Sequence, residues 1–121
     1  MSNAFVHVEL QTKNMERAKK FYGELFDWKL NYMPAMHYTM IDVGKGTAGG
    51  MMQDKKSPSA WMPYVLVDDV VASTQKAKKL GAKILKDTME VPGAGWMSVV
   101  SDPTGAVIGM WKPMSKKAKK K

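Results

Sequence analysis

The chain of 121 residues contains no cysteine, which excludes disulfides, thiolate metal ligands and a cysteine nucleophile. It also lacks any apolar run near the roughly 18 residues that a membrane-spanning helix needs. The first ten residues, MSNAFVHVEL, show no basic segment followed by an apolar one, which predicts that there is no signal peptide. These absences favour a cytoplasmic protein without a membrane span. They leave histidine, carboxylate and amide groups as ligands for any hard metal ion.

Acidic residues are few relative to basic ones, and the net charge is +8. Much of this excess belongs to the segment 115–121, which supplies the lysines Lys116, Lys117, Lys119, Lys120 and Lys121. Without these five, the chain carries 14 of its 19 basic residues against 11 acidic ones. A lysine run without apolar partners predicts a disordered basic tail, for which polyanion binding is an alternative to a solubilising role. The body lacks a basic and aromatic motif for specific nucleic-acid binding.

The first half of the chain predicts one strand, one helix and three more strands. Apolar and polar residues alternate over 5–11, as in a half-buried strand. Asn14 is a suitable N-cap for a helix whose apolar stripe comprises Met15, Ala18, Phe21, Tyr22, Leu25 and Phe26. Further strands are predicted over 28–33, 37–43 and 47–53.

The second half repeats this order after the linker-like segment 54–59. A helix capped by Asp69 runs to Leu80, with Gly81 as its end and a buried stripe of Val70, Thr74, Ala77 and Leu80. The pattern predicts strands over four ranges, 61–67, 82–86, 96–101 and 106–112. An offset of 55 residues superposes Asn14 on Asp69, and an offset of 59 superposes Gly50 on Gly109. The repeat indicates a duplicated unit.

Two such units predict an α+β fold. The tandem βαβββ modules, about 5–53 and 61–113, would form a curved mixed sheet around an open trough, with the helices outside, in one domain of residues 1–114. Strand alternation directs Val6, Val8 and Leu10 toward the first helix, and His7 and Glu9 into the trough. In the fifth strand, Met62, Tyr64 and Leu66 face the trough. Gln53 points away from it if Gly50 points in, and His37 is expected to be exposed.

Several motifs resemble the glyoxalase/bleomycin-resistance, or vicinal oxygen chelate, superfamily. They are HVEL at 7–10, NMERAKKFYGELFDW at 14–28, PYVLVDD at 63–69, LGA at 80–82 and DPTG at 102–105. The similarity spans about 5–113. It implies paired βαβββ modules and, as in many relatives, a homodimer.

The resemblance also implies where a metal ion would be bound. The ligand positions of metal-using members fall on His7, Gly50, Met62 and Gly109. Glycine has no side chain and a thioether is too soft for magnesium, manganese, iron(II), nickel or zinc, so His7 is the one suitable ligand. A catalytic ion normally needs about three protein ligands. We therefore predict no metal and no other cofactor. The alternative is a divalent-metal lyase or dioxygenase that uses His7, Glu9 and further ligands.

The predicted function is binding of a small apolar or aromatic molecule in the trough, with or without catalysis. His7, Glu9 and Tyr64 are the candidate catalytic or hydrogen-bonding residues. The candidate ligand-binding residues are Gly50, Met52, Met62, Trp96, Gly109 and Trp111. Each has a structural alternative, because a strand histidine can be satisfied locally and methionine, tyrosine and tryptophan are ordinary packing residues. A third possibility is an interaction module whose basic tail binds a polyanion.

Overall fold

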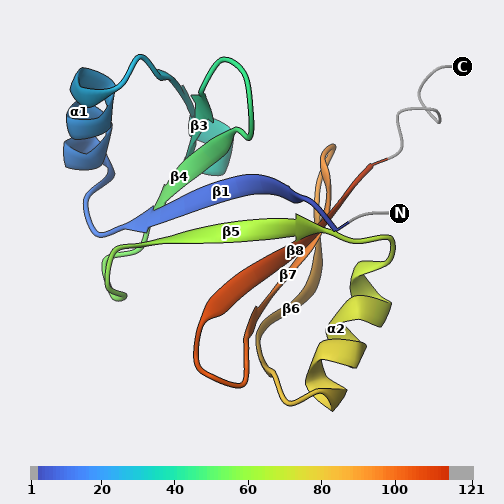
Figure 1. The fold of residues 1–121 in the computed structure, drawn as a ribbon. Helices are drawn as coiled ribbons and strands as arrows, with labels where there is room; N and C mark the ends of the chain where they lie inside the picture. Colours follow the sequence, from blue (N-terminus) through green and yellow to red (C-terminus); the bar gives the residue numbers. More distant parts are fainter. Residues whose placement is uncertain (1–2, 115–121) are drawn as a thin grey trace, which may run out of the picture. The chain divides into compact units, whose positions relative to one another are not determined.

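The computed structural model describes residues 3–114 and contains eight strands and two α-helices (Figure 1). The chain divides into two compact units, which we call the N-terminal module (residues 5–63) and the C-terminal module (residues 64–114 with Asn3 and Ala4). The order strand, helix, three strands occurs twice, so the predicted α+β class and βαβββ repeat are confirmed. Within the described residues, neither helix has the length and apolar character to cross a membrane. The predicted basic tail, 115–121, lies outside the described residues.

The N-terminal module forms a sheet with the strand order β2-β3-β4-β1. β1 pairs with β4 in parallel, whereas β2–β3 and β3–β4 are antiparallel. In the parallel pair, Glu9 is opposite Gly50 and Leu10 is opposite Met51. The elements are β1 (Phe5–Thr12), α1 (Met15–Leu25), β2 (Lys29–Met33), the short 3₁₀ helix η1 (Pro34–Met36), β3 (Tyr38–Asp42) and β4 (Gly49–Gln53).

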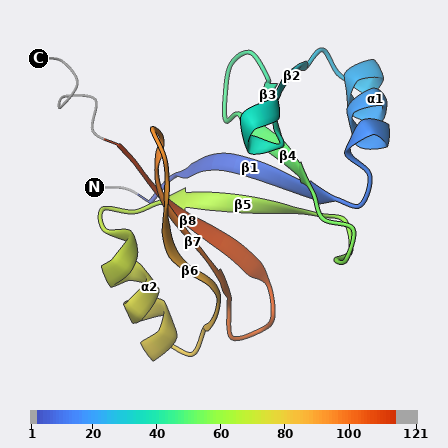
Figure 2. The same cartoon turned by 180° about the vertical axis from the view of Figure 1, so that it is seen from behind.

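The C-terminal module repeats this topology with the strand order β5-β8-β7-β6 (Figure 2). Its first and last strands are again parallel, and Tyr64 is opposite Gly109. The elements are β5 (Ala60–Leu66, which starts in the N-terminal module), α2 (Val70–Lys79), β6 (Lys83–Val91), β7 (Gly95–Ser101) and β8 (Val107–Pro113). β6 is longer than predicted, because Met89, Glu90 and Val91 still pair with β7 after two register shifts.

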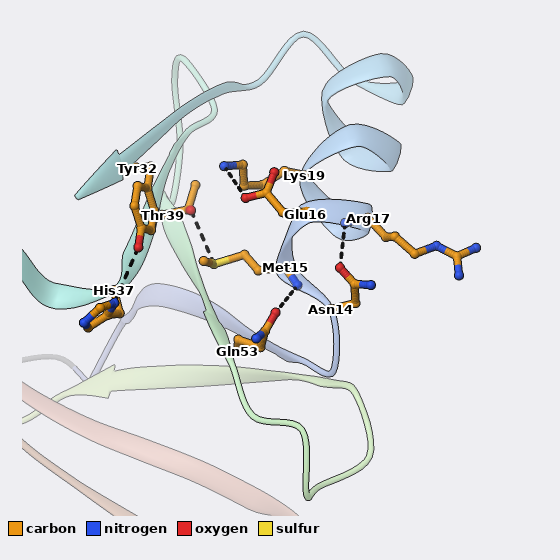
Figure 3. A network of polar contacts seen from close by, with 9 residues as sticks. All are labelled: Asn14, Met15, Glu16, Arg17, Lys19, Tyr32, His37, Thr39 and Gln53. Atoms are coloured by element: carbon orange, nitrogen blue, oxygen red, sulfur yellow. Dashed lines mark hydrogen bonds and ion pairs between the residues drawn. The ribbon is translucent and has the colours of Figure 1, made fainter. Parts of the chain in front are cut away.

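Both helices begin at the predicted caps. The Asn14 side chain accepts the Arg17 backbone N–H at 3.0 Å, and Asp69 accepts that of Ala72 at 3.0 Å. In Figure 3, Gln53 Oε1 also accepts the Met15 N–H at 2.8 Å, which satisfies another free donor of the first turn. Gln53 therefore points to the helix side of β4, as predicted.

The core of the N-terminal module lies between α1 and the sheet, where Leu10, Met15, Ile41 and Met51 are buried. The apolar stripe of α1 is exposed at its later positions: Phe21, Leu25 and Phe26 are 58%, 55% and 44% exposed. Met15 in the first turn is buried, whereas these later side chains form the outer part of a stripe that is wider than the sheet contact. The predicted burial of Leu80 is wrong, since it is 69% exposed after the last turn of α2.

Candidate functional site

The candidate site lies on the face of the N-terminal sheet opposite α1, which we call the helix-free face. Leu10 packs with Met15 of α1, so its strand neighbour Glu9 points to the other side, together with His7. Gly50 and Met52 of β4 share this face, because Glu9 pairs with Gly50 and the side chains alternate along each strand. His7, Glu9, Gly50 and Met52 are thus brought together as the sequence predicted.

A hydrogen-bonded network joins three strands on this face. The Tyr38 hydroxyl of β3 lies 2.8 Å from His7 Nε2 and donates to Glu9 Oε1 at 3.1 Å. Gln11 Nε2 donates to the second oxygen, Glu9 Oε2, at 3.1 Å. Because Tyr38 gives its one proton to Glu9, its oxygen accepts from His7, which places the imidazole proton on Nε2.

Burial shapes the electrostatics of this network. Glu9 is only 6% exposed, and its carboxylate accepts from two neutral donors, which compensates part of the cost of burial. Burial lowers the pKa of His7 from its usual 6.5, while the nearby Glu9 carboxylate acts in the opposite direction. His7 is therefore neutral at pH 7 and can exchange a proton with a bound molecule only as a base or through its hydrogen-bond partners.

Tyr38 covers Gly50, the β4 position that the family resemblance implies for a metal ligand. A Cβ added to Gly50 would collide with the hydroxyl, Cε2 and Cζ of Tyr38. Any side chain at residue 50 would thus require the phenol ring to move. Sequence reasoning missed Tyr38 and Gln11. Alternation could have found Gln11, which shares the parity of Glu9 along β1. The position of Tyr38 over Gly50 depends instead on the register between β3 and β4.

The C-terminal module has a similar ring over a glycine. Tyr64, which is 4% exposed, lies against Gly109, where an added Cβ would collide with its ring. Trp111 shares this face with Gly109, and Met62 shares it with Tyr64, each two residues along its strand. The predicted trough position of Trp96 is wrong. It has the parity of Ser98, which bonds Thr74 of α2, so Trp96 lies on the helix side.

Two pockets lie outside the network. One, of about 280 Å³, is found at the start of α2 and is lined by Asp68, Asp69, Val70, Val71, Thr88, Trp96 and Lys112. The other, of about 270 Å³, lies in the N-terminal module and is lined by Val8, Trp28, Ile41, Val43, Thr47, Ala48, Gly49 and Trp61. Neither of these two pockets is lined by His7, Glu9 or Tyr38.

The side chains present do not fit a divalent-metal centre. Across residues 3–114, no three histidine, aspartate or glutamate side chains are grouped so that they could hold an ion. His7 and Glu9 are joined through Tyr38, and Gly50 offers no donor under the Tyr38 ring. The arrangement can donate and accept hydrogen bonds, but it supplies only two of the roughly three protein ligands of a catalytic ion.

Known proteins match this chain in sequence and in fold. Residues 4–44 match the family described as "Bleomycin resistance protein-like N-terminal". "Putative glyoxylase CFP32" of Mycobacterium tuberculosis is 33% identical over 114 residues, which cover 87% of this chain and 44% of that protein. The "Anthracycline biosynthesis protein DnrV" of Streptomyces peucetius is 34% identical over 55 residues, 46% of this chain and 20% of that protein. The chain spans less than half the length of these curated relatives.

Solved structures show the same fold at low sequence identity. Methylmalonyl-CoA epimerase from Mycobacterium tuberculosis has a TM-score of 0.67 and 13% identity, covering 95% of this chain and 91% of its own. Hypothetical protein BH1468 from Bacillus halodurans has a TM-score of 0.68 and 14% identity, covering 96% and 98%. With its repeated βαβββ modules and its match to the mycobacterial protein, the chain belongs to the glyoxalase/bleomycin-resistance (vicinal oxygen chelate) superfamily.

Proposed function

We propose that this protein binds a small apolar or aromatic molecule on the helix-free face of its N-terminal module, and that it does so without a catalytic metal. The observation that carries the proposal is the His7–Tyr38–Glu9 network. It presents hydrogen-bonding groups beside the half-buried, adaptable side chain of Met52. The match to an anthracycline biosynthesis protein supports an aromatic ligand class.

The His7–Tyr38–Glu9 network gives the bound molecule a defined orientation. Tyr38 and Gln11 hold the Glu9 carboxylate in place, and Tyr38 holds the His7 ring. A polar group on an otherwise apolar ligand would replace water at this network, while its apolar part lies over Met52 and the Tyr38 ring. If the protein is also an enzyme, neutral His7 is the proposed base.

A thermal-shift screen with small aromatic and apolar compounds tests ligand binding. We expect hits to stabilise the wild type and the His37→Ala variant, and to lose most of their effect in His7→Ala and Glu9→Gln. His37 is the matched control, because it is the other histidine and is exposed. Equal stabilisation of wild type, His7→Ala and Glu9→Gln by every hit would overturn the proposed site.

Elemental analysis tests the metal-free part separately. Protein purified without chelator is expected to carry substoichiometric divalent metal and to keep its ligand-induced shift after dialysis against EDTA. A stoichiometric ion whose removal abolishes ligand binding would instead establish the metal-dependent alternative. We further propose a cytoplasmic homodimer, as the resemblance implies, and light scattering coupled to size-exclusion chromatography measures its mass.

A further inference from the structure

Tyr38 lies where a metal ion would have to be if His7 and Glu9 were ligands. Its hydroxyl contacts His7 Nε2 at 2.8 Å and Glu9 Oε1 at 3.1 Å, so one oxygen atom connects a nitrogen donor and a carboxylate donor from β1. Its ring fills the space above Gly50, the implied ligand position on β4. Both the position of the ion and that of its third ligand are thus taken by one side chain.

We propose that Tyr38 is a positioning residue that replaces a metal ion at this site, and that the Tyr38–Gly50 pair keeps divalent ions out. This inference rests on the proposed metal-free site and deepens it, since it assigns the residue that makes the site independent of metal. The phenol holds His7 by an accepted hydrogen bond and Glu9 by a donated one, where a cation would hold the two side chains by coordinate bonds. It also requires glycine at residue 50.

The geometry explains why neither residue can change alone. A glutamate at residue 50 would meet the Tyr38 ring at its first side-chain carbon, so the acid cannot reach His7 and Glu9 while the ring is present. Removing the ring alone leaves two ligands, which is too few for a tightly held ion. Both changes together give one imidazole and two carboxylates on the adjacent strands β1 and β4.

The C-terminal module provides an internal control. Tyr64 covers Gly109 as Tyr38 covers Gly50, so the same pair of substitutions can be made there. At the positions equivalent to His7 and Glu9, β5 carries Met62 and Tyr64, and neither is a good ligand for a hard divalent ion. A ring removal and a new acid in this module therefore yield one carboxylate alone.

Isothermal titration with MnCl₂ and NiCl₂ tests the proposal. The double variant Tyr38→Ala/Gly50→Glu is expected to bind one ion about 100-fold more tightly than the wild type or either single variant. Adding His7→Ala to it is expected to abolish this gain. The control Tyr64→Ala/Gly109→Glu should bind no more tightly than the wild type.

The folded state of each variant is checked by circular dichroism, and Tyr38→Ser/Gly50→Asp serves as a smaller second design. Two results would overturn the proposal: wild type or Gly50→Glu binding the ions as tightly as the double variant, or no gain in any folded double variant. The ligand screen uses metal-free wild-type protein, so a failure of that screen would count against the proposed function and leave the metal titration informative about Tyr38.

Discussion

The two modules share a topology, but they use the same strand positions differently. In the N-terminal module, β1 places His7 and Glu9 on the helix-free face, and Tyr38 reaches across from β3 to join them. In the second βαβββ repeat, β5, which starts in the N-terminal module, places Met62 and Tyr64 at those positions, and both are 4% exposed. Duplication thus supplies the same scaffold twice, with different side chains at equivalent strand positions. The face with the polar network is the one on which to look for function.

The largest expected effect concerns the two covered glycines. At Gly109 an added Cβ would collide with the base and edge of the buried Tyr64 ring, whereas at Gly50 it would meet the tip of the half-buried Tyr38. A small shift of the half-buried tip, which leaves the ring over residue 50, costs less than a shift of the buried ring. We expect Gly109→Ala to destabilise the protein by about 2–3 kcal/mol and Gly50→Ala by about 1 kcal/mol in urea unfolding. Equal losses of stability in the two variants would show that the Tyr38 and Tyr64 rings are held equally firmly.

A second contrast lies on the helix sides of the sheets. Thr39 and Ser98 are equivalent by the 59-residue offset and both are fully buried. Ser98 hydrogen-bonds Thr74 at 2.7 Å, whereas Thr39 donates to the sulfur of Met15 at 3.4 Å, a weak acceptor (Figure 3).

Thr74→Val would leave the Ser98 hydroxyl without this partner, and we expect a loss of about 2 kcal/mol. Thr39→Val removes only a weak bond and is expected to cost less than about 1 kcal/mol. Differential scanning calorimetry on both variants measures the contrast. A larger loss for Thr39→Val would show that its contact with sulfur is stronger than this geometry suggests.

The start of each helix offers a smaller test. Gln53 accepts the Met15 N–H, but the equivalent residue of the C-terminal module is Lys112, which has no acceptor. Gln53→Lys should therefore lower the free energy of unfolding by about 1 kcal/mol, the usual value of a lost capping bond. The reciprocal Lys112→Gln is expected to be neutral or slightly stabilising. A measurable loss of stability in Lys112→Gln would indicate that the lysine has a role in the pocket at the start of α2.

The smallest expected effect is a pH dependence confined to the N-terminal module. The folded protein lowers the pKa of His7 below its ordinary 6.5, so the unfolded chain binds a proton more readily. Unfolding free energy should thus be constant above about pH 6.5 and decrease as the pH falls below it. His7→Gln should flatten this slope in urea titrations at successive pH values. The variant Met62→Leu serves as the control, and the pH dependence of its unfolding free energy should equal that of the wild type.

Local sequence signals predicted most of the fold because they act over short distances. Asn14 and Asp69 each cap a helix as expected, and Gly81 takes the left-handed φ of 104° that ends α2. Alternation also placed His7 and Glu9 on one face. Tyr38 could not be found in this way, because its contact with Gly50 depends on the β3–β4 register, which pairs Tyr38 with Met52.

Burial was the other quantity that sequence patterns misjudged. The apolar stripe of α1 correctly predicts a helix, yet its periodicity does not say how far the neighbouring sheet extends. Phe21 and Leu25 are therefore exposed although they follow the same spacing as Met15. The prediction for Trp96 was wrong for a related reason, since the face of the sheet to which its side chain points depends on the pairing of β7 with β8.

The parallel pairing of first and last strands has a kinetic consequence for each module. Val8 meets Gly49, and Tyr64 meets Gly109, only after the chain has completed a helix and two intervening strands. Closing such a long loop costs entropy before any contact compensates it, so this step should limit the folding rate. Because the pair is parallel, the start of β1 lies beyond the Gly49 end of β4, and Gln53 lies beside Thr12 at the far end. No tight turn can therefore join the two strands, and the helix and the two intervening strands serve as the crossover that parallel pairing requires.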